Sequence, residues 1–439
     1  MFIKKLIAKY NHPQTLIMVS VYPKKGEVYS AGTSGVASYA KNLARSLDRK
    51  VVVLADFNDK PSVYEEDNIL VIRCFRKNRA LMWLSILFYI LKFGDTKTIL
   101  VQFDFAIYGG VLTTSLVIGF LGLLRLGGYK TRVVMHHVVT DALKLSGHLG
   151  INDNFLGKIK GFVYNFVFRL FYRLLGMSSG KIIVLEESLK KNLATIIPSG
   201  KLTSIPHGVD SDLVAIPKDK ARKNLGISQK DYVVLFFGFI NWFKGADFFV
   251  QTYGGINKLL GKKTRFILAG GKSPTMKDKS FYQKYFSQVL EKIYESKNIT
   301  ITGYVAQRQI KNYFGAADLV VFPYRHLMTA SGVLSLVFSY KKPFIISRQL
   351  SEMFCSADFI NTLKIAGLIK EDLVFDLEEK SCLAVTQKIL GNGLKPKMMQ
   401  LARIMREKRA YQQTGWLWDQ TLFNTNLNFK HSPVLGYSR

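Results

Sequence analysis

Hydrophobic residues in this chain occur in two patterns, short continuous runs and longer stretches with helical spacing. Residues 233–237, VVLFF, form an apolar, β-prone run without polar alternation, which is typical of a strand covered on both faces of a parallel sheet. Similar runs recur at residues 16–22, 51–55, 70–74, 99–103, 133–136, 182–185, 265–269, 299–301, 319–322 and 344–347. Stretches with helical spacing, such as residues 36–47 and 246–253, lie between them. The alternation predicts an α/β protein with doubly wound parallel sheets.

The strand runs fall into two series, and the chain of 439 residues is too long for one typical core. Between the series, Pro206 and Gly208 interrupt regular structure and residues 218–223, KDKARK, are polar and basic. We therefore predict one domain in residues 1–212, a second in 213–400, and a C-terminal helix and tail in 401–439. Two similar sheets in tandem imply a cleft between them.

Two loops of the second half are suited to phosphate binding. Gly238 follows the strand at 233–237, and Lys244 and Gly245 lead into the next helix. Turn amides, a helix N-terminus and a nearby lysine together make a phosphate site. Ser331 and Gly332 lead in the same way into a helix at 333–340. Two helix ends and one lysine would share the charges of a diphosphate without a metal ion, although either corner alone also suits an ordinary strand-to-helix turn.

Polar residues of the first half follow its strands. Ser34 is a potential N-cap for the helix at 36–47, and Gly35 follows it. His136 and His137 come directly after a strand, and ligands of doubly wound sheets bind beyond the carboxyl ends of strands. A histidine there either hydrogen-bonds a sugar hydroxyl or pairs with the backbone, and the residues alone do not decide between these roles.

The formal net charge of +31, from 62 Lys and Arg against 31 Asp and Glu, favours an anionic partner. Nucleotide phosphates, a membrane surface and nucleic acid all fit this charge. Three scattered cysteines are too few for a disulfide framework or a zinc site, so we expect a cytoplasmic protein.

Three apolar segments bear on the membrane. Residues 80–93 are shorter than the about 20 that span a bilayer, and residues 107–127 are long enough but contain several glycines and Arg125, so we predict a buried helix there. Residues 158–176 are basic and aromatic, and their cations are either solvated or rest on anionic lipid headgroups. We therefore expect at most a peripheral attachment to the inner face of the cell membrane.

The ordered series of motifs resembles the nucleotide-sugar-dependent, retaining glycosyltransferases of family 4, which have the GT-B fold of two Rossmann-like domains facing across a cleft. The matching pieces, in the family's order, are AGTSGVASYAKNLARSL, VQFDFAIYGG, RVVMHH, IPHGVD, VLFFGFINWFKG, RFILAGG, ITGYV, AADLVVFPYR and SGVLSLVFSYKKPFIIS. GWLWDQTL, at 415–422, is similar to the family's closing helix, which crosses back to the N-terminal domain.

The resemblance implies that the C-terminal domain binds a nucleoside diphosphate sugar and that the N-terminal domain binds a saccharide or lipid-linked acceptor. It implies transfer with retention at the anomeric carbon. From the residues themselves we expect no cofactor and no metal. Lys244 matches the phosphate-binding lysine, and His136 matches the histidine near the transferred sugar, with His137 as its alternative. Further substrate-binding positions are Gly35, Gly238, Gly271, Ser331, Gly332 and Val333.

Two departures from the family pattern affect donor recognition. Met328 and Leu336 stand where the family often has a pair of glutamates, and Phe239 replaces a basic residue, so side chains that usually contact the donor sugar and ribose are missing. Our hypothesis is that Arg325 supplies part of the missing positive charge.

The departures leave two alternatives to a glycosyltransferase of cell-surface glycan or glycolipid synthesis. One is an inactive GT-B scaffold whose basic surface binds nucleic acid, but the cations are dispersed and no recognition motif is present. The other is a GT-B nucleotide-sugar epimerase, for which we can assign no convincing set of carboxylates. We therefore expect no nucleic-acid partner.

Overall fold

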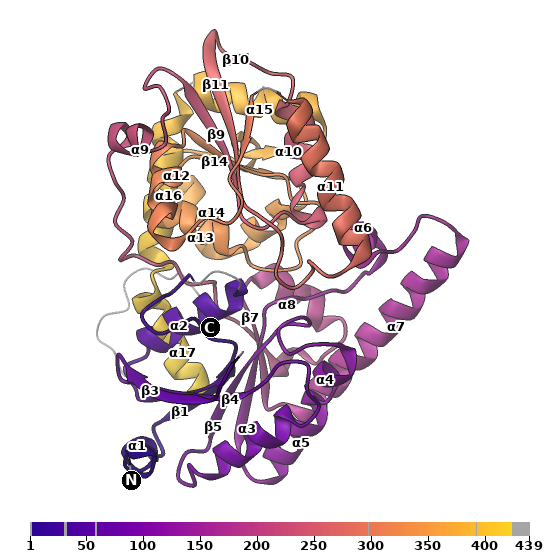
Figure 1. Ribbon diagram of the computed structural model, residues 1–439, viewed down its shortest axis with the longest axis vertical. Coiled ribbons are helices and arrows are strands. Elements are labelled where there is room, and N and C mark those ends of the chain that lie inside the picture. The colour runs from indigo at the N-terminus through magenta and orange to yellow at the C-terminus, as the bar shows by residue number, and fades with distance from the viewer. Residues whose placement is uncertain (1, 30–32, 58, 297, 392, 424–439) are drawn as a thin grey trace.

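The computed structural model describes residues 2–29, 33–57, 59–296, 298–391 and 393–423, and Figure 1 shows two lobes stacked along the long axis. Gly32 of the motif AGTSGVASYAKNLARSL lies outside the described residues, and so do residues 424–439 of the predicted tail.

The N-terminal lobe is built on an eight-stranded sheet. In spatial order its strands are β3 (Ser62–Glu66), β4 (Ile69–Phe75), β2 (Val51–Asp56), β1 (Leu16–Ser20), β5 (Thr98–Phe103), β6 (Lys130–Met135), β7 (Lys181–Val184) and β8 (Leu202–Ser204). All neighbours pair in parallel except β3 and β4, which pair antiparallel.

The C-terminal lobe holds a seven-stranded sheet. Its spatial order is β10 (Lys258–Leu259), β11 (Lys262–Ala269), β9 (Tyr232–Phe237), β13 (Leu319–Phe322), β14 (Phe344–Ser347) and β15 (Val374–Phe375), with β12 (Ile299–Ile301) paired to β11. Only the β10–β11 hairpin is antiparallel. The predicted α/β fold with mostly parallel sheets is confirmed.

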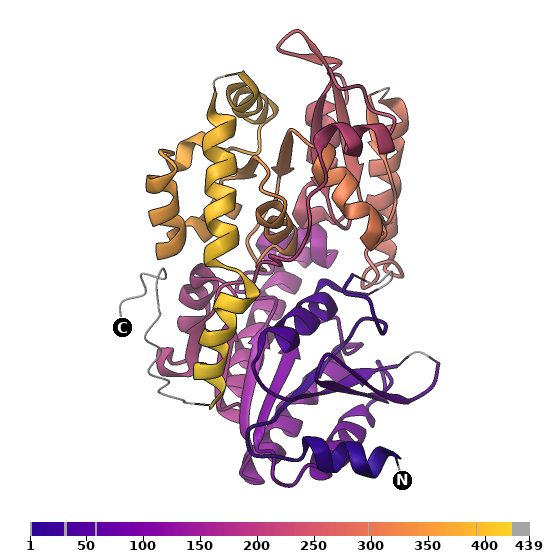
Figure 2. The same cartoon turned by 90° about the vertical axis from the view of Figure 1, so that its left-hand side faces the viewer.

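Helices cover both faces of each sheet (Figures 1 and 2). Before β9 they are α1 (Phe2–Tyr10), α2 (Gly35–Ser46), α3 (Met82–Leu91), α4 (Val111–Ser115), α5 (Val117–Leu126), α6 (Ser146–Leu149), α7 (Phe155–Ser178), α8 (Glu187–Ala194) and α9 (Lys218–Asn224). After β9 they are α10 (Ala246–Tyr253), α11 (Ser280–Glu295), α12 (Gln307–Ala316), α13 (Gly332–Ser339), α14 (Ala357–Ile365), α15 (Glu379–Gly391), α16 (Leu394–Lys408) and α17 (Tyr411–Phe423). The 3₁₀ turns are η1 (Leu143–Leu145), η2 (Ser199–Lys201), η3 (Trp242–Lys244), η4 (Leu350–Cys355) and η5 (Lys370–Asp372).

The continuous apolar runs form the centre of each sheet. β1, β2 and β5 are buried along their whole length, and so are Val233 to Phe236 of β9. Successive side chains of a strand point to opposite faces, so these strands need helices on both sides. This requirement explains why the runs lack polar alternation.

The chain passes between the lobes twice, and the two crossings lie side by side. The first follows β8, and the second joins α16 to α17, the yellow helices of Figure 2. Val209 donates its amide to the Arg409 carbonyl over 2.7 Å, and Tyr411 donates its amide to the Val209 carbonyl over 3.0 Å. α17 then packs on α2, where Trp418 and Leu422 are buried against the N-terminal sheet.

The segment at 107–127, predicted as one buried helix, is instead two short helices, α4 and α5, that meet at Leu116. One side of α5 is buried, through Val117, Phe120, Leu121 and Leu124, while Leu123 and Leu126 are exposed. Among the helices of the described residues, we find none that combines the length and the apolarity needed to cross a membrane.

Candidate functional site

A cavity of about 970 Å³ is lined by residues of both lobes. The N-terminal lobe contributes the ends of β5 and β6 and parts of α2, α4 and α7, and the C-terminal lobe contributes the turns after β9, β11 and β13. Within the described residues, Asp104 is the one carboxylate in its lining, against Lys160, Lys244 and Lys279. The cavity is therefore mostly apolar with an excess of positive charge, which suits an anionic ligand.

The turn after β9 depends on two glycines. Gly238 has a φ of 116° and Gly245 a φ of 70°, in the left-handed region where a side chain is strained. A Cβ built on Gly245 would also meet the Pro323 carbonyl oxygen at 2.0 Å. These glycines let the chain leave the strand, form η3 and enter α10 within a few residues.

η3 places Lys244 at the cavity. Its Nζ lies 5.9 Å from the ring centres of Phe243 and Tyr324, and no described carboxylate or carbonyl accepts a hydrogen bond from it. Burial lowers the pKa of Lys244 to about 8. A partly buried cation without a counter-charge is energetically costly, and an incoming phosphate would relieve that cost.

The N-terminus of α13 points into the same cavity. Ser331 caps this helix by accepting the Leu334 amide over 3.2 Å, and Gly332 and Val333 form its first turn. Amides of a first turn have no partner within the helix and carry the positive end of its dipole. The three residues before Leu334 all line the cavity. Together with Lys244 they form one wall that is suited to an anion.

His136 lies at the end of β6 and is 6% exposed. Its Nε2 is 2.7 Å from the Gln102 Oε1, and its ring packs edge-on against Tyr39. Burial lowers the pKa of His136 to about 3, so the imidazole is neutral at physiological pH. With Nε2 donating to Gln102, Nδ1 remains an acceptor for a ligand hydroxyl.

His137, its neighbour, points its Nδ1 to the carboxylate of Asp104, which follows β5. Burial opposes ionisation of Asp104, but the His137 imidazole and the hydrogen bond from the Ala106 amide together keep the pKa of this carboxyl below its usual value. Asp104 also accepts the Ala106 amide over 2.8 Å. Both residues line the cavity, so the polar groups that follow β5 and β6 meet as their position predicts.

Gly35 and Gly271 line the cavity as well, from α2 and from the turn after β11. A Cβ on Gly271 would approach the Tyr304 amide nitrogen to 3.0 Å, so a side chain there would crowd the backbone. The resemblance implies seven substrate-binding positions, His137 included. The structure brings all of them to one cavity, together with Lys244 and His136.

Arg325 is the exception and requires a correction. Its guanidinium donates to both carboxylate oxygens of Asp247, over 2.8 and 2.6 Å, and to the Trp242 carbonyl over 2.6 Å. It is absent from the cavity lining. Arg325 therefore connects the loop after β13 to η3 and α10, and the Asp247 carboxylate already balances its charge.

Several residues of the cavity were not predicted from the sequence. Asn241 in the turn after β9 lines the cavity with a buried Oδ1 that has no hydrogen-bond donor among the described residues. His148 and His207 also line it, and burial lowers the pKa of each to about 4. His207 belongs to the motif IPHGVD. The position of this motif beside the first crossing between the lobes could have identified His207 as a cavity residue.

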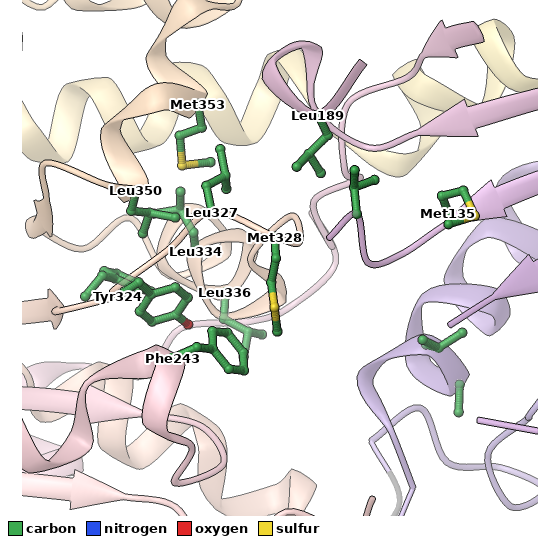
Figure 3. Close-up of a cluster of buried hydrophobic side chains, with 14 of the residues drawn as sticks. Met135, Leu189, Phe243, Tyr324, Leu327, Met328, Leu334, Leu336, Leu350 and Met353 are labelled. Atoms are coloured by element: carbon green, nitrogen blue, oxygen red, sulfur yellow. The ribbon is translucent and has the colours of Figure 1, made fainter. Parts of the chain in front are cut away.

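Met328 and Leu336, which replace the glutamate pair, both line the cavity. They are 3% and 6% exposed, and Figure 3 shows them beside Phe243 in an apolar cluster. This wall therefore offers no carboxylate to a sugar or ribose hydroxyl. Met328 instead accepts the Val138 amide through its carbonyl over 2.8 Å, which joins the lobes at the cavity.

The described residues contain no group of three or more His, Cys, Asp or Glu side chains placed to hold a metal ion. Asp210 and Asp212 have the one-residue spacing of a metal-binding aspartate pair, but neither lines the cavity. Asp210 accepts the Asp212 amide over 3.1 Å and so shapes the crossing segment.

Comparisons with known proteins agree with this geometry. Residues 231–360 match the family model of glycosyl transferases group 1. No curated protein sequence matches the chain. Sucrose-phosphate synthase from Thermosynechococcus elongatus is similar in structure, with a TM-score of 0.69, 16% identity and coverage of 93% of this chain and 98% of its own.

Two further solved structures are similar along nearly the whole chain. HepE from Anabaena, in complex with UDP-glucose, has a TM-score of 0.66 and 13% identity over 94% of this chain and 100% of its own. WaaG, a glycosyltransferase involved in lipopolysaccharide biosynthesis, has a TM-score of 0.60 and 13% identity over 94% of this chain and 100% of its own. With two Rossmann-like sheets around one cavity and the group 1 domain in its C-terminal lobe, this chain is a glycosyltransferase with the GT-B fold.

Proposed function

We propose that this enzyme transfers a sugar from a nucleoside diphosphate sugar to the hydroxyl of an acceptor, with retention at the anomeric carbon and without a metal ion. The observation that carries the proposal is Lys244, a partly buried cation with no described counter-charge, beside the N-terminus of α13. HepE was solved with UDP-glucose, which supports a nucleotide-sugar donor.

In the proposed reaction the bond between the anomeric carbon and the phosphate oxygen breaks, and its electron pair leaves with the nucleoside diphosphate. The acceptor oxygen forms the new bond, and its proton passes to the departing phosphate. Lys244 and the first amides of α13 stabilise the negative charge of the leaving group, and each such contact is typically worth about 3 kcal/mol in the transition state. Retention is supported by the resemblance to family 4 and requires attack on the face from which the diphosphate departs.

His136 is assigned to the sugar. Because its imidazole is neutral, it accepts a hydrogen bond from a sugar hydroxyl through Nδ1 and adds no charge to the site. Asp104 and His137 lie on the same wall, and we assign them to the positioning of the acceptor.

The acceptor is proposed to be a saccharide or a lipid-linked molecule, and the pathway to be cell-surface glycan or glycolipid synthesis. The similarity to WaaG supports the pathway, and the net charge of +31 supports an anionic membrane surface as a further partner.

Thermal stabilisation against a panel of UDP-, GDP- and ADP-sugars tests the donor, since a ligand that binds the native state raises the melting temperature. We expect one nucleotide series to stabilise the wild type and to lose most of its effect on Lys244→Ala. Lys263→Ala, a substitution of an exposed lysine on β11, is the matched control.

Product analysis separates the competing activities. Sugar transferred only when an acceptor is present, with the anomeric configuration retained, supports the proposal, and isomerised donor formed without acceptor supports an epimerase. Salt-sensitive binding to arbitrary duplex with no response to any nucleotide sugar would favour the nucleic-acid scaffold. Activity that EDTA abolishes and manganese restores would contradict metal independence.

A further inference from the structure

Most of the large hydrophobic side chains that the described residues expose belong to one layer of helices in the N-terminal lobe. The layer consists of α3, α4, α5 and α7, which contact one another in series and lie on the same side of the sheet in Figure 1. Soluble monomers rarely expose a contiguous apolar face of this kind unless a partner covers it.

α7 carries the longest part of this face. Phe171, Tyr172 and Leu175 of its last turns are buried, whereas its other side exposes residues spaced by three or four. These exposed residues are Phe155, Leu156, Ile159, Phe162, Val163, Phe166, Val167, Leu170, Leu174 and Met177. Phe162 and Phe166 are 66% and 68% exposed, and the N-terminal half of the helix projects beyond the lobe in Figure 1.

The charge of the layer has one sign. α7 adds Lys158, Lys160, Arg169 and Arg173, all exposed, and none of the four helices contains an aspartate or a glutamate. A helix with a broad apolar face and flanking cations is suited to the interface of an anionic bilayer, because the side chains bury in the acyl region and the cations meet the headgroups.

The apolar face continues into the active-site cavity. Val163 and Val167 of α7 are 52% and 49% exposed, and both line the cavity, as does Val111 of α4. Deeper in the same wall are Phe168 and Phe171, which pack against Phe105. An apolar path therefore leads from the outer surface of α7 and α4 to the polar groups at the ends of β5 and β6.

From this continuity we infer that the acceptor is a membrane amphiphile. Its hydrocarbon chain lies along α7 and α4, its polar head enters the cavity beside Lys160, and the layer of α3, α4, α5 and α7 rests on an anionic bilayer. The inference rests on the proposed glycosyl transfer, for which it names the acceptor class.

The docking surface is tested with vesicles of phosphatidylcholine, with and without phosphatidylglycerol, in a co-sedimentation assay. The wild type is expected to bind the vesicles that contain phosphatidylglycerol, more weakly at high salt. The double variant Phe162→Ser, Phe166→Ser is expected to lose at least about tenfold in affinity, since two large apolar side chains no longer enter the acyl region. The variant Arg169→Gln, Arg173→Gln is expected to lose part of the salt-dependent binding.

The matched control is Ile365→Ser, Ile369→Ser, which removes two exposed isoleucines from the C-terminal lobe and should leave vesicle binding unchanged. None of these positions lines the cavity, so every variant should keep the thermal stabilisation by nucleotide that the wild type shows. If no nucleotide stabilises the wild type, the proposed function is wrong even where vesicle binding is intact.

The acceptor class is tested with alkyl phosphates of increasing chain length. Affinity should rise about fourfold for each methylene that the path buries, and Val163→Asp should flatten this dependence. Affinity that is independent of chain length would overturn the acceptor assignment. The wild type could instead fail to bind vesicles and form a dimer that the double variant Phe162→Ser, Phe166→Ser dissociates. That result would show that a second copy of this chain covers the face, and it would overturn the inference.

Discussion

Gly238 leaves the space in which the Lys244 amine lies, since a Cβ built on Gly238 would come within 3.1 Å of Lys244 Nζ. Lys244 is the last residue of η3, which follows the turn at Gly238, so the chain brings the lysine back beside this glycine. The position of the Lys244 amine therefore depends on the lack of a side chain at residue 238.

Gly238→Ala should weaken donor binding without removing any charge. The φ of 116° is strained for alanine, at a cost of about 1–3 kcal/mol, and the added methyl displaces the Lys244 amine. We expect a lower melting temperature and at least about tenfold weaker binding of the nucleotide by calorimetry. Gly255→Ala, at an exposed glycine with open space for a Cβ, should change neither quantity.

Donor affinity should decrease as pH rises through the pKa of Lys244, which burial places at about 8. The amine is protonated and attractive to the diphosphate below this pKa, and neutral above it. Calorimetric titration with UDP between about pH 6.5 and 9.5 should therefore show constant affinity first and a progressive loss afterwards. Lys244→Arg should bind with little pH dependence over this range, because arginine stays charged. Identical profiles for both proteins would contradict the role of Lys244.

His136 should contribute to turnover as a neutral group. Replacing it by alanine removes an acceptor near the sugar, and we expect kcat to fall about a hundredfold while nucleotide affinity changes little. Because burial lowers its pKa to about 3, His136 should add no ionisation to the kcat/KM profile between about pH 5 and 8. His12→Ala, at an exposed position two residues after α1, is the control. An ionisation near neutrality that disappears with His136→Ala would show that the imidazole is charged in the free enzyme.

The sequence could predict the elements of the fold because they follow from local patterns. The run at 233–237 and the helix at 246–253 correspond to β9 and α10, since apolar continuity and helical spacing are properties of neighbouring residues. β10 and β15 are two-residue strands with no such pattern, and β3 is a half-buried edge strand, so these were missed.

The site was predictable where a residue's role depends on its position after a strand. Lys244, His136 and Ser331 met this condition and share the cavity. Arg325 met it as well, but its charge is balanced by Asp247, a residue on another element, and sequence spacing carries no information on that pairing. Asn241 was missed for the converse reason, because only the folded structure shows that it lines the cavity and that its Oδ1 is buried without a donor.

Arg325 should therefore behave as a structural residue. Arg325→Ala leaves the Asp247 carboxylate with the Tyr285 hydroxyl and its own backbone, so we expect a loss of about 1–3 kcal/mol in the free energy of unfolding and little change in intrinsic nucleotide affinity. Urea denaturation of Arg325→Ala, Asp247→Asn and the double variant should give a coupling energy of about 0.5–3 kcal/mol. Full stability combined with lost donor binding would instead restore the hypothesis that Arg325 contacts the diphosphate.

The second crossing between the lobes should depend on Arg409, which is 2% exposed. It donates to Asp358 of α14 over 2.6 Å and to Glu186, which follows β7, over 2.9 Å, so one guanidinium joins carboxylates of both lobes. Arg409→Met would leave both carboxylates buried without this partner, and we expect the free energy of unfolding to fall by about 3–5 kcal/mol. Combining it with Glu186→Gln and Asp358→Asn should recover part of the loss.

The pH dependence of Arg409→Met follows from Glu186, whose pKa burial raises to about 7 against the attraction of Arg409. Removing the arginine takes away that attraction and raises the pKa of Glu186 further. A carboxyl whose pKa is higher in the folded state stabilises the fold below its unfolded pKa, and this contribution is lost as pH rises through the folded value. The deficit of Arg409→Met relative to wild type, measured by urea denaturation, should therefore be smallest near about pH 5 and grow toward about pH 8. A deficit that is constant over this range would mean that Arg409 acts through packing, such as its contact with the Phe359 ring, rather than through the carboxylates.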